Sequence, residues 1–438
     1  MRFRILVLAV AVFLLSGGLA SAENRHLKLD DAITLALADG PGLKAAESSA
    51  EAAAREAKAS GRRRWGALDA VASYQLYQDD QMVRPISRQL LAEGFAGLPF
   101  DDEQWHYGVV AEVPLYLGGK LASSVEVAKI SAEKAMVLLE GTRWQVRFNV
   151  TSLYASAQSL DAVARALDRQ IAALESTNSR LELMVSEGER PDVDRLKVVE
   201  ELEGARADRA TVGANRIKVG ALLLSLLGKN PTDRVTVDHL PEQLPRLVVD
   251  AAELHGEIEG VSTIRQAHLS LNQSEQAVDI ATSEFIPKVV ARGNYMVNDA
   301  PSLDGAEDTW GLSLGVVVPL IHGGARSERR SAAKERRQAA EFALEKARLE
   351  TQAQLEGGLA SFGAALDTVR AAEARVAAGG EAARIEQIRY DTGAGTIEDL
   401  LRARAREAGA LAAVARARAS VLTAAAHVNT IAEKEAVK

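Results

Sequence analysis

The chain has 438 residues, a formal net charge of −8 and an aromatic content of only 4%. It contains no cysteine, which excludes disulfide bonds and thiolate metal sites. The negative charge argues against nucleic acid as a partner. Long tracts are dominated by Ala, Glu, Arg, Leu and Gln, which is the composition of long helices.

Residues 1–22 predict a secretory signal peptide. Arg2 and Arg4 precede an apolar core at 5–15, and Ala20-Ser21-Ala22 supplies the small residues of a cleavage site. An N-terminal transmembrane anchor is the alternative, but the apolar run is short for one. No later stretch has about twenty uninterrupted apolar residues, so we expect any membrane insertion to use strands.

The segment after the signal predicts one helix and then two strands. Helix formers occupy residues 29–59, and the Asp pair at 30–31 is available as an N-cap. Apolar or aromatic residues then alternate with small or polar ones at 68–77 and again at 105–113, on either side of a polar loop at 78–104. This period of two is typical of strands with apolar surroundings on one side only.

A Pro-Leu-x-x-Gly-Gly turn follows the second strand at 113–120 and returns at 318–325. A proline can end a strand because it cannot donate to the ladder, and a glycine pair permits a sharp change of direction into a helix. Such a string alone is weak and is often an ordinary turn. Its recurrence in the same context makes it informative. The shared positions are Pro114, Gly118, Gly119, Pro319, Gly323 and Gly324.

Long helices follow each turn. Their apolar residues recur at steps of four and three, which is the spacing of a coiled-coil seam. Tight breaks divide these helices into hairpins. The expected elements after the first turn are a helix at 121–187, a helix to 227, an irregular linker at 228–249, a helix at 250–285, strands at 289–297 and 310–318, a helix at 326–390 and a last helix at 396–431.

The two halves form an internal repeat. Tyr74 and Tyr295 are 221 positions apart, whereas Trp105 and Trp310 are 205 apart. One change of length in the loop between the paired strands explains both offsets. A repeat of this length predicts two structurally equivalent halves. We therefore divide the chain into a first repeat at 23–227, the linker at 228–249 and a second repeat at 250–438.

Four strands with an apolar outer face cannot close a barrel, and open sheet edges are costly in a bilayer. Closed barrels need about eight strands or more, so several chains must share one. The chain resembles the TolC-like outer-membrane efflux channel family, both in the duplicated turn and in the helix–helix turns at 187–194 and 390–401. The resemblance implies a mainly α fold with a transmembrane β-barrel portion, to which each chain of a homotrimer contributes four strands. It also implies that the long coiled-coil hairpins form a periplasmic tunnel.

The resemblance further implies a location in the cell outer membrane, with an extension into the periplasm. The implied function is passive: the channel of a tripartite efflux or type I secretion system. The implied partners are a periplasmic membrane-fusion adaptor protein, an inner-membrane efflux pump or ABC transporter, and outer-membrane lipid. A secreted structural coiled-coil scaffold without channel activity is the alternative, but it leaves the one-sided strands unexplained.

By the same resemblance, Tyr390, Asp194 and Asp399 fall on positions that contribute to a periplasmic aperture. The chain departs from the best-known members by having Gly395 and Arg402 where they place a constricting Arg and a second Asp. The helix–helix turns are implied to contact the adaptor through Gly188, Glu189, Arg190, Gly393, Ala394 and Gly395. Plain helix caps are the simpler role of the glycines, and favourable placement at positive helix ends is the simpler role of the aspartates.

Other chemistry finds little support in the sequence. The seven histidines are scattered, and none forms a metal-binding pair such as H-E-x-x-H. Gly228-Lys229 lacks the flanking residues of a phosphate-binding loop. We therefore expect no enzyme activity, no cofactor and no metal. Arginines at 62–64 and at 326–330 are expected near the periplasmic membrane boundary, although a solvated helix face is an equally good interpretation.

Overall fold

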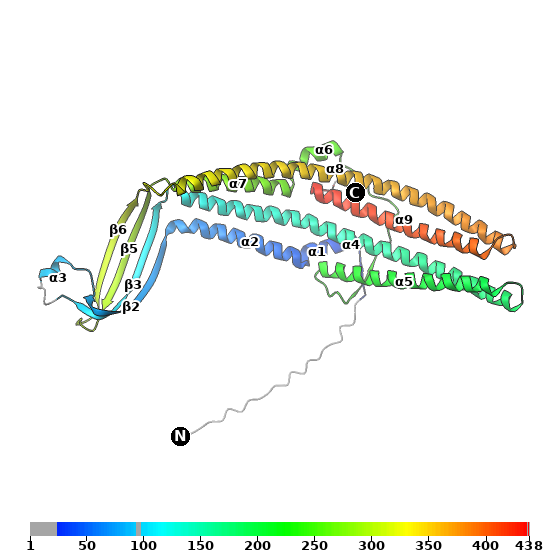
Figure 1. Cartoon of the computed structure of the whole chain (residues 1–438), viewed down its shortest axis with the longest axis horizontal. Coiled ribbons are helices and arrows are strands. Elements are labelled where there is room, and N and C mark those ends of the chain that lie inside the picture. The colour runs from blue at the N-terminus through cyan, green and yellow to red at the C-terminus, as the bar shows by residue number, and fades with distance from the viewer. Residues whose placement is uncertain (1–23, 93–97, 436, 438) are drawn as a thin grey trace, which may run out of the picture. The chain divides into compact units, whose positions relative to one another are not determined.

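The computed structural model describes residues 24–92, 98–435 and 437, so the predicted signal peptide at 1–22 lies outside the described residues. The chain is mainly helical (Figure 1). The helices are α1 (Leu29–Asp39), α2 (Pro41–Arg62), α3 (Arg88–Ala92), α4 (Lys120–Ser186), α5 (Asp192–Leu226), α6 (Ala251–Glu257), α7 (Ser262–Ser283), α8 (Ala325–Asp391) and α9 (Ile397–Ala432). The strands are β1 (Asn24–Leu27), β2 (Ala67–Met82), β3 (Phe100–Tyr116), β4 (Arg234–Val237), β5 (Lys288–Asp299) and β6 (Glu307–Val317).

The described residues form two compact units. The sheet unit comprises residues 42–146 and 245–362 with the chain end from 425, and it contains β2, β3, β5 and β6. The hairpin unit comprises residues 24–41, 147–244 and 363–424. None of the described helices combines the length and apolarity needed to cross a membrane.

In the sheet unit, four antiparallel strands lie side by side in the order β2-β3-β5-β6 (Figure 1). Most of their large exposed apolar side chains stand on one face, among them Leu76, Trp105, Trp310, Leu312 and Leu314. This one-sided surface follows from alternation along each strand. Within the described residues, β2 and β6 form the two edges of the sheet and pair with no further strand.

The strand registers reproduce the internal repeat. Tyr74 lies opposite Trp105 in the first hairpin, and Tyr295 lies opposite Trp310 in the second. These are the residues related by 221 and 205 positions, so the two hairpins have the same register. The central pairing of β3 with β5, with Val109 opposite Tyr295, then joins the first repeat to the second.

Two strand predictions need correction. Pro114 does not end its strand, because β3 continues to Tyr116 with a shift of register between these residues. A proline is tolerated at such an irregularity because the regular ladder is already broken there. In addition, the predicted loop at 78–104 is shorter than expected: β2 runs to Met82, β3 begins at Phe100, and α3 lies between them.

The helical predictions need three corrections. The helix expected at 250–285 is broken into α6, a 3-10 turn at Ile258–Gly260 and α7, which mirrors the break between α1 and α2 at Gly40. Asp30 and Asp31 lie in the first turn of α1, and the N-cap is Lys28. The linker at 228–249 is not wholly irregular, because it contains β4, which pairs in parallel with β1.

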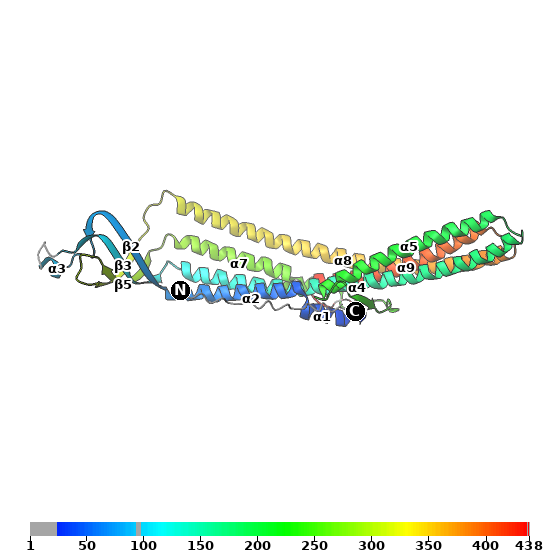
Figure 2. The ribbon, with the colours of Figure 1, turned by 90° about the horizontal axis from the view of Figure 1, so that it is seen from below.

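In the hairpin unit, α5 folds back along α4 and α9 along α8 (Figures 1 and 2). Arg209 of α5 bonds Asp168 of α4 at 2.7 Å, and Arg418 of α9 bonds Glu373 of α8 at 2.7 Å. Such exposed pairs contribute little stability each, roughly 0–1 kcal/mol. The hairpins are held mainly by buried apolar seams.

Tyr154 joins the small β1–β4 sheet to α4. Its buried hydroxyl donates to the carbonyl oxygen of Leu27 at 2.9 Å and accepts from the backbone N–H of Asp238 at 3.1 Å. Burial, above all, raises the pKa of Tyr154 to about 12. The folded chain therefore keeps this proton at a pH where the unfolded chain has lost it.

We expect Tyr154→Phe to destabilise the hairpin unit by about 1–3 kcal/mol at neutral pH, since two backbone groups lose their partner. In the unfolded chain a tyrosine ionises near pH 10. The contribution of Tyr154 is therefore present below about pH 10 and is lost as the pH rises toward about 12. Thermal unfolding in detergent across this range checks this: the variant should lose that part of the alkaline decline, and an identical decline in both proteins would contradict it.

Candidate functional site

The two helix–helix turns of the hairpin unit have the same geometry. Gly188 donates to Val185 O at 3.1 Å and Glu189 to Met184 O at 2.8 Å. Gly393 and Ala394 repeat these bonds to Tyr390 O and Arg389 O at 3.1 and 2.8 Å. Both glycines have positive φ, 75° and 77°. These are Schellman caps, so the capping role expected of the glycines is confirmed.

Gly395 occupies a confined position in the second turn. Its N–H donates to Arg389 O at 2.9 Å, and a Cβ atom added at this position would lie 3.1 Å from the Arg389 Cβ. A longer side chain there would require the neighbouring helix end to give way. Glycine therefore fits the tight turn at this position.

The aspartates after the turns lie at helix N-termini. Asp399 accepts a hydrogen bond from the Thr396 hydroxyl at 2.7 Å, and its N–H donates to the same hydroxyl at 3.1 Å, which caps α9. Asp194 lies in the first turn of α5, where a negative charge is favourable. Arg402 is 3.8 Å from Asp399 but bonds Glu398 at 2.9 Å. Its charge therefore acts chiefly on Glu398.

Tyr390 is buried, with only 4% of its surface exposed. It belongs to an apolar cluster formed by both hairpins, whose other buried members are Leu174, Leu181, Val198, Leu202, Ala205, Ile397 and Leu400. The guanidinium carbon of Arg190 lies 5.1 Å from the ring centroid, so the first turn covers the tyrosine with a cation–π contact.

Charged groups surround the Tyr390 hydroxyl. Burial raises its pKa, Arg190 opposes this shift, and Asp194 and Asp391 add to it. The phenol is therefore neutral at physiological pH. Its oxygen is enclosed and has no hydrogen-bond partner among the described residues. An enclosed, unsatisfied hydroxyl is unfavourable by about 1–3 kcal/mol, so it calls for a functional explanation.

Polar contacts connect the two hairpins beside Tyr390. Arg180 of α4 donates to Asp391 of α8 at 3.1 Å, and Gln387 donates to the same carboxylate at 2.9 Å. Arg404 of α9 donates to the Thr177 hydroxyl at 3.1 Å and also to the Gln387 side-chain oxygen. Burial lowers the pKa of Arg404, which fits its place inside this network.

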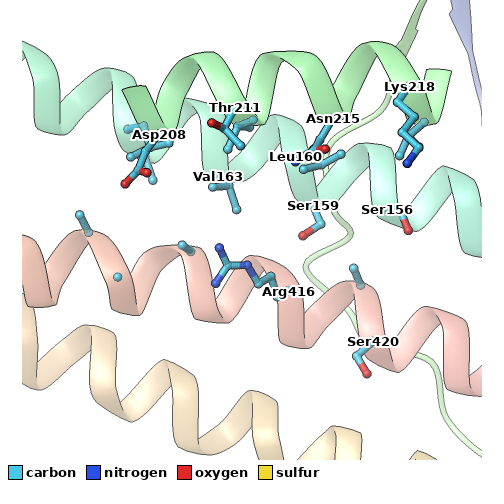
Figure 3. Close-up of a pocket in the computed structure, with 18 of the residues that line it drawn as sticks. Ser156, Ser159, Leu160, Val163, Asp208, Thr211, Asn215, Lys218, Arg416 and Ser420 are labelled. Carbon is cyan, nitrogen blue, oxygen red and sulfur yellow. The ribbon is translucent and has the colours of Figure 1, made fainter. Parts of the chain in front are cut away.

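A hollow of about 1040 Å³ lies among α4, α5 and α9 in the hairpin unit (Figure 3). Short polar side chains reach it from all three helices, including Ser156, Ser159, Thr211, Asn215 and Ser420 (Figure 3). Lys218 and Arg416 bring positive charge, and Asp208 and Glu201 bring negative charge. Leu160, Val163 and several alanines line it as well, so the surface combines apolar groups with charges of both signs.

The structure brings Tyr390 and Asp194 into one charged neighbourhood, whereas Asp399 and Arg402 form separate contacts at the start of α9. Sequence reasoning missed Arg180, Gln387 and Arg404. A single sequence gives no signal for contacts between helices about two hundred positions apart. Among the described residues there is also no group of three or more His, Asp or Glu side chains placed to hold a metal.

The chain matches the family model described as outer membrane efflux protein over residues 32–229 and 258–432. A search of curated proteins gave no match. Several solved structures share its fold. The outer membrane protein VceC of Vibrio cholerae is 18% identical, with a TM-score of 0.76, over 93% of this chain and 96% of that one.

Two further structures are similar over most of the chain. The CmeC outer membrane channel of Campylobacter jejuni is 17% identical, with a TM-score of 0.78, over 93% of this chain and 86% of that one. The MtrE outer membrane channel of Neisseria gonorrhoeae, in its open state, is 19% identical, with a TM-score of 0.73, over 93% and 89%. The match to the family model covers most of both repeats, with the four strands of the large sheet and both hairpins, and the chain therefore belongs to the outer membrane efflux protein family.

Proposed function

We propose that the chain is one subunit of a homotrimeric outer-membrane channel that passively conducts substrates delivered from the periplasm. The observation that carries this proposal is the four-stranded sheet, with one apolar face and two edges that no described strand of the same chain covers. In a bilayer such edges must be paired, and only further copies of the sheet supply matching edges. Three copies give twelve strands, the number that the family resemblance implies.

The internal repeat specifies how the edges meet. Within the chain, β3 of the first repeat pairs with β5 of the second, with Val109 opposite Tyr295. The residue equivalent to Val109 in the second repeat, 205 positions later, is Leu314. The residue equivalent to Tyr295 in the first repeat, 221 positions earlier, is Tyr74. We infer that β6 of one copy pairs with β2 of the next and that Leu314 lies opposite the neighbouring Tyr74. The same rule applied around a ring closes the barrel.

The hairpin unit supplies the periplasmic part of the path. The surface among α4, α5 and α9, which mixes apolar side chains with hydroxyls, an amide and charges of both signs, suits the wall of a conduit that passes substrates without binding them strongly. The tip turns at 187–191 and 392–396 are exposed apart from the intermediate Arg190 and Gly395, and they suit docking to a periplasmic adaptor that links the channel to an inner-membrane pump or ABC transporter. Energy then comes from the pump, and this chain needs no catalytic site.

The aperture is proposed at the tips, where Asp194, Asp399 and Tyr390 lie near the turns. Threefold symmetry would bring three copies of each aspartate toward one axis. Like charges held close attract cations. The resemblance also implies that Tyr390 contributes to this aperture, where its ring joins the two hairpins under Arg190.

The first prediction concerns sheet closure. Tyr74→Cys combined with Leu314→Cys should give covalent dimers and trimers on mild oxidation, because the native chain has no cysteine and the two positions face each other across copies. Val109→Cys with Tyr295→Cys is the matched control, and it should link only within a chain. Absence of intermolecular products from the first pair, with an efficient control reaction, would contradict the shared barrel.

The second prediction concerns the charge of the aperture. Asp399→Ala should reduce cation selectivity and the weak block by divalent ions in planar bilayers. Asp399→Asn removes the charge but keeps an oxygen that accepts from Thr396, so it should match the alanine variant if charge is responsible. Wild-type selectivity in the Asp399→Asn and Asp194→Asn variants would show that these carboxylates only cap their helices.

The third prediction concerns Tyr390. Tyr390→Phe preserves the ring under Arg190 and removes only the hydroxyl, so the apolar cluster should stay intact while the closed aperture weakens. We expect a higher resting conductance with thermal stability at least equal to that of the wild type, because the hydroxyl that is removed has no partner among the described residues of the chain. Tyr390→Ala, which also removes the ring, should lower stability as well. A resting conductance equal to wild type in Tyr390→Phe would mean that the hydroxyl has no role in closure.

A further inference from the structure

The first strand–helix turn is packed tightly against the second repeat. Gly118 is buried, and a Cβ atom at this position would lie 2.8 Å from both the Ile286 Cβ and the Ser283 carbonyl oxygen. Ile286 follows α7 and precedes β5, so the junction between this helix and strand sits directly on the turn between β3 and α4.

The repeat places equivalents of this strand–helix turn and this helix–strand junction at the two edges of the sheet. Gly118 corresponds to Gly323, and Ile286 corresponds to Trp65. The correspondence also matches α7 to α2, since both have 22 residues and their first residues, Ser262 and Pro41, are 221 positions apart. In the chain itself, however, nothing lies within 4 Å of a Cβ atom placed on Gly323, and Trp65 is 74% exposed.

The residues beside Gly323 are also uncovered. Leu320 is 85% exposed and Ile321 is 89% exposed. They follow β6, whereas Trp65 precedes β2, so the two surfaces lie at opposite edges of the same sheet. A large exposed apolar patch of this kind marks a contact surface.

We propose that Trp65 of one copy packs over Gly323 of the next copy, in the position that Ile286 takes over Gly118 within the chain. The proposal rests on the head-to-tail assembly proposed above and adds the residues that join its helix–strand junctions. The Arg64 guanidinium carbon lies 5.4 Å from the Trp65 ring centroid, so one ring face is covered by its own chain. The other face is available to the neighbouring turn.

The helices above this junction carry a second, independent match. In the chain, Val137 of α4 is buried with Leu269 of α7. The corresponding residues are Phe342 of α8 and Ser48 of α2. Val137 is 1% exposed and Phe342 67%. Compared with the Val137–Leu269 pair, the residue on α8 is larger (Phe342) and the residue on α2 is smaller (Ser48). The α2 helix of the neighbouring copy therefore has room for Phe342.

Charge follows the same correspondence. Arg265 of α7 forms an ion pair with Glu140 of α4. The equivalent positions are Lys44 of α2 and Glu345 of α8, which carry the same charges. The proposed contact between α2 of one copy and α8 of the next therefore keeps an attractive pair where the chain has one internally.

A membrane-boundary role for Trp65 is the competing interpretation. Tryptophan beside Arg62, Arg63 and Arg64 also suits a lipid–water interface. That role would leave Gly323, Leu320 and Ile321 without a contact, and it would not explain the size match at Phe342. We therefore favour the second copy, and the test separates the two.

The test is disulfide cross-linking of Trp65→Cys with Gly323→Cys in the full-length protein in membranes. We expect covalent dimers and trimers, and only dimers when chains carrying one substitution each are mixed. Val109→Cys with Tyr295→Cys, which should link within a chain, is the control for the oxidation. Linking of the Tyr74/Leu314 pair but not of the Trp65/Gly323 pair would overturn this proposal and leave the channel assembly standing, whereas failure of both pairs would overturn both.

Gly323 has a positive φ of 56°, so a cysteine there strains the turn, and a second measurement avoids this position. We expect Trp65→Ala and Phe342→Ala each to abolish the SDS-resistant oligomer at temperatures where wild type retains it, with Trp65→Phe restoring most of it. An unchanged oligomer in Trp65→Ala, together with quenching of Trp65 fluorescence by brominated lipid, would assign this side chain to the membrane boundary and overturn the contact.

Discussion

The structure depends on a sheet that its own chain leaves incomplete. Four strands present a continuous apolar face, and the outer strands β2 and β6 end the sheet with backbone groups that no described strand of the same chain pairs. Unpaired strand edges are costly in lipid and prone to pairing in water. Long helical hairpins and exposed tips fit the proposed subunit, whose sheet is completed by other copies.

The internal repeat is the means by which one sequence meets this constraint. Contacts between the first and second repeats are already made once inside each chain, as in β3 with β5 and in α4 with α7. A head-to-tail ring makes the equivalent contacts again between chains. The residues of the contacts within a chain differ from those proposed between copies. Ile286 corresponds to the larger Trp65, and the Val137–Leu269 pair corresponds to Phe342 and Ser48.

Local patterns in the sequence predicted the elements that obey local rules. Alternation at Trp310 to Val316 defined a strand, and Gly188 and Gly393 marked the turns because each needs a positive φ. Pairing between distant segments leaves no comparable pattern in the sequence. The β1–β4 pair and the bond from Arg404 to Thr177 join residues about two hundred positions apart, and no periodicity reveals them. The prediction that Pro114 ends a strand was wrong because a shift of register inside β3 accommodates the proline.

The tips combine a buried apolar cluster with exposed polar contacts. Apolar packing around Tyr390 holds the hairpins together, while the bonds of Arg180, Asp391 and Gln387 are largely exposed to solvent and are individually weak. The central claim, that three copies of the chain complete one closed sheet, is tested most directly by native mass spectrometry of the detergent-extracted protein. The account predicts a single species of three chains; a stable monomer or dimer that retains its strands would contradict it.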